Sequence, residues 1–301
     1  DGSITGDPGR SYYWSPWLEM QRKRRDVHDL RENVLALPSS QGRGFFPVVD
    51  TERQRQNIQK PRRCTVVDGK LVDSPTGHWR IFMEPDENSN LVAFMDPAYG
   101  TGSANACIVM MDTNLREVVA TYVDPTCPPY DLSREIVYAA RSWARGRSDM
   151  LIGWEVNGPG SSMHHDFERL RWYNVFHHKR LGQRVETRTK RLGWTSTRVT
   201  KRVLFSDLAR ALADDTVVCP DEEIIDELES TVVYKDGALG PARLEVDTSS
   251  GAREAHGDRV VAFAGAVMLL EEANPDAERP DPNYGLPDYS LGSMLNMDEL
   301  L

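Results

Sequence analysis

The chain has 301 residues, of which 40% are hydrophobic and 27% are charged, and its formal net charge is −10. These proportions are typical of a folded domain with a core and argue against a disordered chain. No apolar run approaches the ~20 residues that a membrane helix needs, so a transmembrane protein is not expected. The four cysteines show no C-x-x-C spacing, which predicts a reduced cytosolic protein without a zinc site. They are Cys64, Cys107, Cys127 and Cys219.

The first 78 residues contain few periodic apolar positions. The chain begins Asp1-Gly2-Ser3 without a methionine, which indicates a fragment boundary and no signal peptide. A polar helix is expected from about residue 18 to 35. Further on, Asp68-Gly69 lies between Val66-Val67 and Leu71-Val72, which is a hairpin pattern. We interpret residues 1–78 as a connector that packs on the domain after it.

A meander of three strands is expected between residues 90 and 123. The apolar run Leu91–Met95 ends on Asp96, and Pro97 and Gly100 then break the strand. The runs 106–112 and 117–123 are joined by a tight turn at Thr113-Asn114. A carboxylate at the exposed end of a buried strand is poorly placed for packing and well placed for a metal or a phosphate.

Helices and strands alternate in the remainder of the chain. The pattern predicts helices starting at Asp131 or Ser133, at Ser161 or Ser162, at about Arg198 and at Glu222, a strand over 150–155, and a last helix over about 257–273. Short strands are expected at 175–176 and 217–219, and a hairpin at 231–246. Such an order predicts a mixed α/β fold of the ribonuclease H-like kind, with a central sheet flanked by helices. The Pro-rich acidic tail after residue 274 is expected to be flexible.

Three carboxylates stand at the ends of expected elements. Asp96 ends the first strand of the meander, Glu155 ends the strand over 150–155, and Asp258 starts the last helix. That helix is rich in Ala and Gly, so its backbone can approach the sheet closely. Converging carboxylates repel one another, and divalent cations relieve this repulsion. Oxygen ligands suit Mg²⁺ or Mn²⁺, and two such ions about 3.5–4 Å apart can hydrolyse a phosphodiester.

The negative net charge conceals a basic segment. From Met163 to Arg202 there are eleven Lys or Arg and three Asp or Glu, a net charge of +8. A basic stretch in an acidic chain indicates a local contact with a polyanion, although a solvated basic face is an equal alternative.

Four segments together resemble the C-terminal nuclease domain of tailed-phage terminase large subunits. They are Asp96-Pro97-Ala98-Tyr99-Gly100, Trp154-Glu155-Val156-Asn157-Gly158-Pro159-Gly160, Gly193-Trp194-Thr195-Ser196-Thr197 with Lys201, and His256-Gly257-Asp258. The resemblance spans about residues 90 to 270. It implies a metal-dependent DNA endonuclease that cuts concatemeric phage DNA during genome packaging, with Asp96, Glu155 and Asp258 as the catalytic metal ligands for Mg²⁺ or Mn²⁺.

The same resemblance implies the remaining site residues and partners. Arg188, Lys190, Arg191, Thr195 and Lys201 are the expected DNA contacts, with Asn157 and His256 supporting the ligands. Residues 1–78 correspond to the end of a truncated ATPase and its linker, 79–274 to the nuclease domain and 275–301 to the tail. Expected partners are double-stranded DNA and, in the full motor, the portal and the small terminase subunit. The expected location is the host cytoplasm, transiently at the procapsid portal.

Two departures and three alternatives stay open. No G-x-x-x-x-G-K-[ST] motif is present, so ATP-driven translocation is not expected of these residues. No acid stands one turn after Asp258, which leaves Asp112 as the candidate for a fourth ligand. The alternatives are a Holliday-junction resolvase or integrase-like nuclease, an actin-like phosphate-binding module, and a structural motor part with inactive nuclease chemistry.

Overall fold

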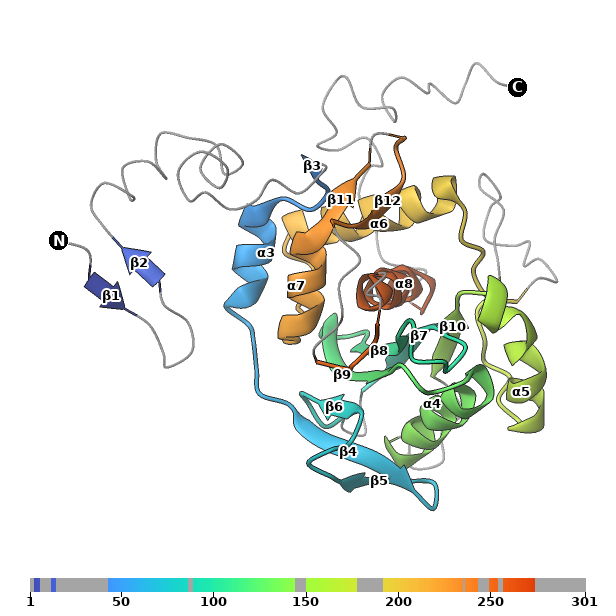
Figure 1. Cartoon of the computed structure of the whole chain (residues 1–301). Helices are drawn as coiled ribbons and strands as arrows, with labels where there is room; N and C mark the ends of the chain where they lie inside the picture. Colours follow the sequence, from blue (N-terminus) through green and yellow to red (C-terminus); the bar gives the residue numbers. More distant parts are fainter. Residues whose placement is uncertain are drawn as a thin grey trace, which may run out of the picture.

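Figure 1 shows the chain as a computed structural model that describes residues 3–5, 12–14, 43–85, 89–143, 150–177, 192–234, 236–242, 249–253 and 257–273. The expected helix near residues 18–35 and the tail after residue 274 lie outside these ranges. Within them, no helix is long and apolar enough to cross a bilayer.

A seven-stranded mixed sheet forms the centre of the molecule. Its order is β10-β7-β8-β9-β6-β4-β5; β10 runs parallel to β7, and all other neighbours are antiparallel. The strands are β4 (Arg62–Val67), β5 (Lys70–Asp73), β6 (Trp79–Ile81), β7 (Leu91–Asp96), β8 (Ala106–Asp112), β9 (Glu117–Asp124) and β10 (Leu151–Trp154). The expected meander is thus confirmed as β7-β8-β9.

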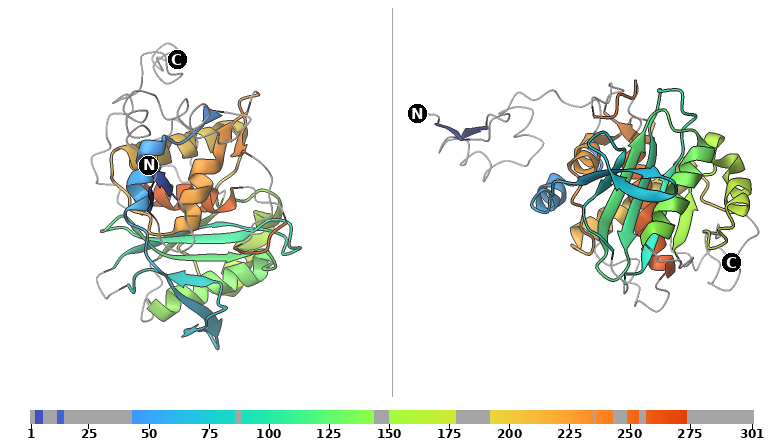
Figure 2. Two further views of the ribbon diagram at one scale, coloured as in Figure 1. Left: turned by 60° about the vertical axis from the view of Figure 1, so that its left-hand side comes forward. Right: turned by 90° about the horizontal axis from the view of Figure 1, so that it is seen from below.

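Helices cover both faces of this sheet (Figures 1 and 2). They are α3 (Val48–Arg55), α4 (Pro129–Trp143), α5 (Met163–Arg169), α6 (Arg198–Ala213), α7 (Glu222–Ser230) and α8 (Asp258–Ala273), with a short 3-10 helix η2 (Gly158–Ser162) before α5. Alternate residues of β7 enter two cores. Val92 and Phe94 pack with α6, α7 and α8, whereas Ala93 and Met95 pack with α4 and α5.

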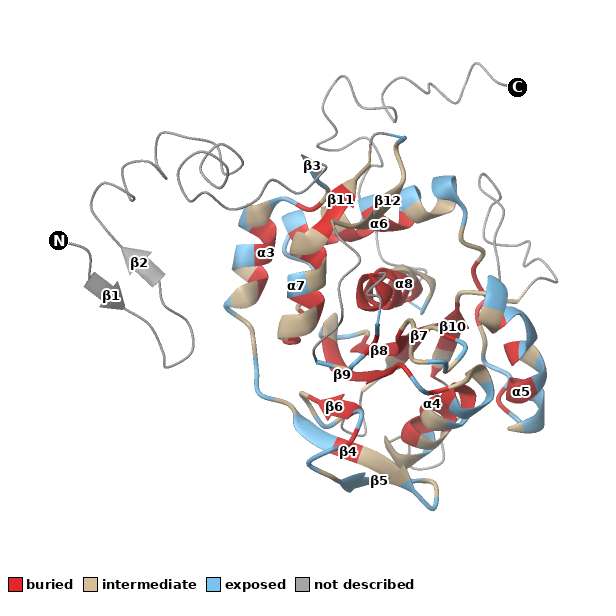
Figure 3. Cartoon of the chain, viewed as in Figure 1, coloured by how far each residue is buried: buried red, intermediate tan, exposed pale blue. Residues whose placement is uncertain are grey.

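The last helix lies directly on the sheet and is buried on all sides (Figure 3). A Cβ atom at Gly265 would lie 2.2 Å from the Phe94 ring, so only glycine permits this approach. The small residues of α8 therefore allow the close packing that the sequence predicts, and they bring the start of α8 to the sheet.

Residues 43–78 are part of the domain and not only a connector. The Asp68-Gly69 turn has φ angles of 49° and 75° and joins β4 to β5, which extend the central sheet. The boundary expected at residue 79 therefore falls within this sheet. Earlier in the chain, α3 also contacts the domain. The side chain of Gln54 donates to Val217 O at 2.9 Å and accepts from Cys219 N at 2.9 Å, and so holds the segment after α6.

A smaller sheet has the order β12-β11-β3 and consists of β3 (Arg43–Gly44), β11 (Thr231–Val233) and β12 (Leu239–Pro241). A separate pair is formed by β1 (Ser3–Thr5) and β2 (Tyr12–Trp14). Two expectations were wrong in detail. The expected strands at 175–176 and 217–219 form only isolated bridges, Val175 with Ile152 and Val218 with Glu117.

Candidate metal and nucleic-acid site

Asp96 is the last residue of β7 and is partly buried. Val92 and Phe94 point into the core under α8, so the alternation of a strand directs Asp96 to the same side of the sheet. Its neighbour across the ladder, Cys107, belongs to the same core. The carboxylate thus ends the strand on the face that α8 covers.

Glu155 reaches the same edge through the parallel pairing of β10 with β7. Trp154 is in register with Met95, and the Glu155 N–H donates to Met95 O at 3.0 Å. Because β7 and β10 run parallel, both strands end at the same side of the sheet. Glu155, the residue after β10, therefore lies beside Asp96, the last residue of β7. On its other side Glu155 forms a bridge with Trp194.

Asp258 is the first residue of α8 and only 6% exposed. Its Oδ2 accepts a hydrogen bond of 2.9 Å from the backbone N–H of Asn105. Asn105 directly precedes β8, at the end of that strand that pairs with Asp96. This bond holds the start of α8 against the strand ends, so all three expected ligands come to one edge of the sheet.

The charges of these acids act on one another. Burial raises the pKa of Asp96 well above its usual range, the charges of Glu155 and Asp258 raise it further, and Lys201 lowers it. Burial also raises the pKa of Glu155, against the lowering effects of Lys201 and of a hydrogen bond with Ser196. Among the described residues, the site is therefore an acidic cluster whose charge the Lys201 ammonium partly compensates.

The segment from Gly193 to Thr197 runs along Glu155. Asn157 and Ser196 exchange two hydrogen bonds: the side-chain amide donates to Ser196 O at 2.9 Å and accepts from Ser196 N at 2.7 Å. Thr197 then caps α6 in a capping box with Thr200. These two bonds tie the segment at Ser196 to the residues that follow Glu155.

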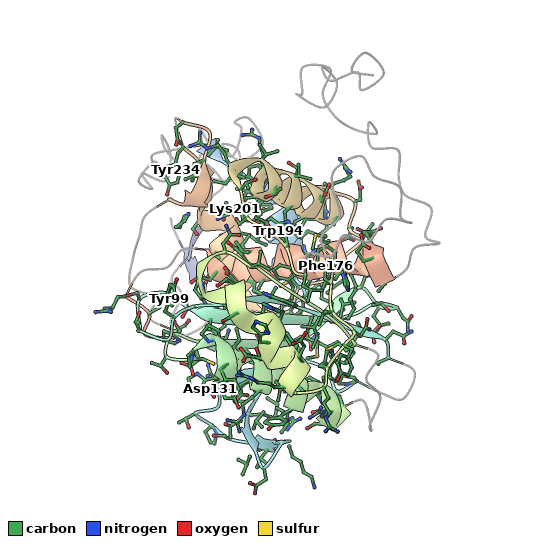
Figure 4. All side chains as sticks on the ribbon, turned by 90° about the vertical axis from the view of Figure 1, so that its right-hand side faces the viewer. Tyr99, Asp131, Phe176, Trp194, Lys201 and Tyr234 are labelled. Carbon is green, nitrogen blue, oxygen red and sulfur yellow. The ribbon has the colours of Figure 1, made fainter. Side chains whose placement is uncertain are left out.

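Lys201 lies in the first turn of α6, with its ammonium 5.4 Å from the centre of the Phe205 ring. Figure 4 shows Lys201 and Trp194 on the α8 side of the sheet, with Asp131 on the opposite side. Thr195 O accepts a hydrogen bond of 2.8 Å from the Thr200 hydroxyl. Two of the expected DNA contacts, Thr195 and Lys201, are thereby brought next to the acids.

The three carboxylates have the oxygen donors that a divalent metal prefers, but they are not already arranged as a set of metal ligands. All three donors are oxygens, which hard divalent cations prefer. Among the described residues, however, no three His, Cys, Asp or Glu side chains are arranged to hold a metal ion.

Asp112 is excluded as a fourth ligand. It pairs with Leu91 at the far end of β7, whereas Asp96 ends that strand. Its Oδ1 accepts from the backbone N–H groups of Asn114 at 2.8 Å and Leu115 at 3.0 Å. Asp112 is therefore a turn-forming residue. The other expected site residues Arg188, Lys190, Arg191 and His256 lie outside the described residues.

Two residues of the site have no signal in the sequence. Asn105 holds Asp258 through its backbone, which no side-chain pattern reveals. Glu227 of α7 accepts from the first N–H groups of α8. Burial raises the pKa of Glu227 to about 7, the Arg259 guanidinium lowers it, and Asp258 raises it. Glu227 stands among other acids of an amphipathic helix, and only the packing of α7 against α8 distinguishes it.

The mixed sheet with helices on both faces, and with acids at the ends of β7, β10 and the start of α8, defines a ribonuclease H-like fold. Its structural neighbours are large terminase nuclease domains. The nuclease of thermophilic phage G20c with bound cobalt is 12% identical, with a TM-score of 0.50 over 72% of this chain and 96% of that chain. This likeness confirms the expected fold.

Two further neighbours have lower TM-scores. The G20c nuclease with bound magnesium is 13% identical, with a TM-score of 0.49 over 72% of this chain and 96% of that chain. The Thermus phage P74-26 nuclease domain is 12% identical, with a TM-score of 0.48 over 73% and 95%. No protein-family model matches the sequence, and no curated protein is significantly similar to it.

Metal binding should stabilise the protein more at pH 8 than at pH 5. The folded-state pKa values of Asp96, Glu155 and Glu227 are raised, the last to about 7. Protonation of these carboxyl groups therefore stabilises the folded state. This contribution is complete below the unfolded-state pKa of about 4 and is lost as the pH rises through the folded-state pKa values. Above that range the carboxylates of Asp96 and Glu155 are ionised and can accept a cation. At ~100 times its dissociation constant, Mn²⁺ should raise the melting temperature by ~5–10 °C at pH 8.

The measurement is the difference in melting temperature between Mn²⁺ and EDTA at the two pH values. Asp96→Asn serves as the control and should show a much smaller difference at pH 8. An equal shift at both pH values would contradict metal binding through ionised carboxylates.

Proposed function

We propose that this chain is a divalent-metal-dependent DNA endonuclease that cuts concatemeric phage DNA during genome packaging. The observation that carries the proposal is the meeting of Asp96, Glu155 and Asp258 at one edge of the sheet, where their charges act together on the pKa of Asp96. A buried cluster of like charges is unfavourable, and a bound cation would relieve the repulsion between the ionised carboxylates.

Asp96, Glu155 and Asp258 would hold Mg²⁺ or Mn²⁺, since the donors are carboxylate oxygens. Bound ions, two in the proposed form, would activate water and stabilise the leaving oxygen of the phosphodiester. The chain's own residues prepare this chemistry. Asn105 N–H orients the Asp258 carboxylate, and the Asn157–Ser196 pair fixes the strand beside Glu155.

Among the described residues, Lys201 is well placed to meet a DNA phosphate. Its charge already acts on Asp96 and Glu155, so a phosphate drawn to this ammonium would lie next to the acids. Thr195 lies on the same segment, and Arg188, Lys190 and Arg191 precede it in the basic stretch. Contacts of this type position a duplex without reading its sequence. We therefore propose DNA binding with little base specificity.

The wider setting is proposed from the resemblance and from the fold shared with the G20c nuclease. In a packaging motor, the proposed partners are double-stranded DNA, the portal and the small terminase subunit. The proposed location is the host cytoplasm and, transiently, the procapsid portal. The G20c nuclease has been described with bound cobalt, which is consistent with a divalent cation here.

The test is digestion of a supercoiled plasmid with Mg²⁺, with Mn²⁺ and with EDTA. Linear and then smaller products should appear with either metal and be absent with EDTA. A parallel panel of linear, nicked and four-way-junction DNA compares the alternatives. A strong preference for junctions would favour a resolvase. No cleavage with either metal would leave a structural part of a packaging motor as the function.

A further inference from the structure

A buried set of ion pairs lies behind the acidic edge and includes none of its three proposed ligands. We call Arg80, Asp221, Glu223, Glu227 and Arg259 the ion-pair network. Arg259 directly follows Asp258 in α8 and is 3% exposed. Burying charges this deeply costs free energy unless they are paired, so the network is expected to have a structural or functional role.

The first contact of the network caps α8. The initial N–H groups of a helix have no partner within that helix. Glu227 Oε2, which belongs to α7, accepts from Arg259 N at 3.0 Å and from Val260 N at 3.2 Å. A negative charge at this end also suits the helix dipole. The cap is thus supplied from another helix and fixes the first turn, which carries Asp258, relative to α7.

The second contact fixes the guanidinium of Arg259. It donates to Glu227 Oε1 at 2.6 Å, to Glu223 Oε2 at 2.8 Å and to the Ser249 hydroxyl at 2.8 Å. One residue of α8 is therefore held by two acids of α7, while its neighbour Asp258 is held by Asn105 on the sheet.

The network then continues into the central sheet. Glu223 forms an ion pair with Arg80 of β6, and Arg80 Nη1 lies 3.1 Å from Asp221 Oδ1. The Thr121 hydroxyl of β9 donates to Asp221 Oδ2 at 2.7 Å. The start of α8, the start of α7 and two strands are thereby joined through directional, charge-assisted bonds.

We propose that Glu227 and Arg259 are positioning residues of the metal site, which set the place of Asp258 over the ends of β7 and β10. This inference rests on the proposed function. Neither residue is proposed to touch the substrate. Their effect comes from fixing the turn that carries a ligand, and outer partners of this kind typically change metal affinity or activity 10–100-fold.

The test compares Glu227→Gln with Glu229→Gln in the full chain. Glu229 is a matched control on the same helix. Glu229 accepts hydrogen bonds from Arg55 Nε at 3.0 Å and Arg55 Nη2 at 2.8 Å. When Glu229 is replaced, Arg55 still has Asp226 as a partner, just as Arg259 still has Glu223 when Glu227 is replaced. Glu229, however, faces α3, away from α8. Glu227→Asp is the second variant, because it keeps the charge and shortens the reach to the N–H groups.

Mn²⁺ affinity is measured by calorimetry, and kcat and KM by cleavage of one duplex, at a temperature where all variants are folded. For Glu227→Gln, we expect metal affinity and kcat to fall at least tenfold, while the KM for DNA stays within twofold of wild type. For Glu227→Asp, we expect a smaller fall in metal affinity and kcat. Glu229→Gln should keep both values.

Affinity and kcat of both Glu227 variants within twofold of those of Glu229→Gln would overturn the positioning role and leave the proposed function standing. A wild-type chain that neither binds Mn²⁺ nor cleaves DNA would instead overturn the proposed function, and the positioning role with it.

Discussion

Plasmid cleavage should fall at least ~10³-fold when Asp96 or Asp258 is replaced by asparagine. Metal-ion catalysis lowers a barrier by several kcal/mol, and ~4 kcal/mol corresponds to this factor. The amide keeps the size of the side chain and, at position 258, an oxygen that can accept from Asn105 N–H. The fold should therefore persist. Without metal, the melting temperature should equal or exceed that of wild type, because one charge leaves a repelling cluster.

Cleavage rates with Mg²⁺ and melting curves in EDTA give the two readouts for each variant. Asp131→Asn is the matched control, since Asp131 is an exposed acid on the opposite side of the sheet (Figure 4). It should keep wild-type activity. If either Asp96→Asn or Asp258→Asn cleaved DNA at a rate near that of wild type, the site would be assigned wrongly.

The second large effect is expected from Gly160→Ala, although Gly160 carries no functional group. A Cβ atom there would lie 1.8 Å from the carbonyl oxygen of Glu155 and 3.0 Å from Pro97 Cγ. Both neighbours belong to the loops that leave β10 and β7, so the methyl group must displace the backbone next to two proposed ligands. Displacement of catalytic groups by about 1 Å can cost ~10²-fold in rate. We expect at least this loss of cleavage, together with a lower melting temperature.

Gly44→Ala provides the comparison, because the nearest atom to its Cβ is Phe46 O at 4.0 Å, an ordinary contact. This variant should keep both stability and cleavage. Activity of Gly160→Ala equal to that of Gly44→Ala, with an unchanged melting temperature, would show that the loop after Glu155 yields without moving the ligand.

Local chemistry made much of the fold predictable. Apolar runs bounded by Pro, Gly and Asn marked the meander, and Asp68-Gly69 marked the β4–β5 turn, whose positive φ angles these residue types tolerate. The start of α6 at Arg198 agrees with the capping box at Thr197. The two strands at the β5 side of the sheet were harder to recognise. β4 and β5 are polar and partly exposed, so residues 43–78 had no clear apolar period and were interpreted as a connector.

The sequence indicated which acidic residues could form the candidate site, but it did not indicate which residues hold them in place. Asp96, Glu155 and Asp258 stand at element ends, which a sequence shows directly. The contribution of Lys201 to their charge balance depends on where α6 lies. Asp112 had the same signature as Asp96, a strand-end acid, and only the antiparallel register placed it at the opposite end, where it forms a turn.

By itself, the sequence determined the local elements and the acids that end them, because strand alternation, capping and turn formation depend on near neighbours. The meeting of these acids was decided by tertiary structure. Parallel pairing brings Glu155 beside Asp96, and the approach of Gly265 to Phe94 lowers α8 onto the sheet, with Asp258 at its start. The cap that Glu227 gives to α8 was decided in the same way. Such contacts join residues far apart in the chain, and packing and charge pairing in the folded core select them.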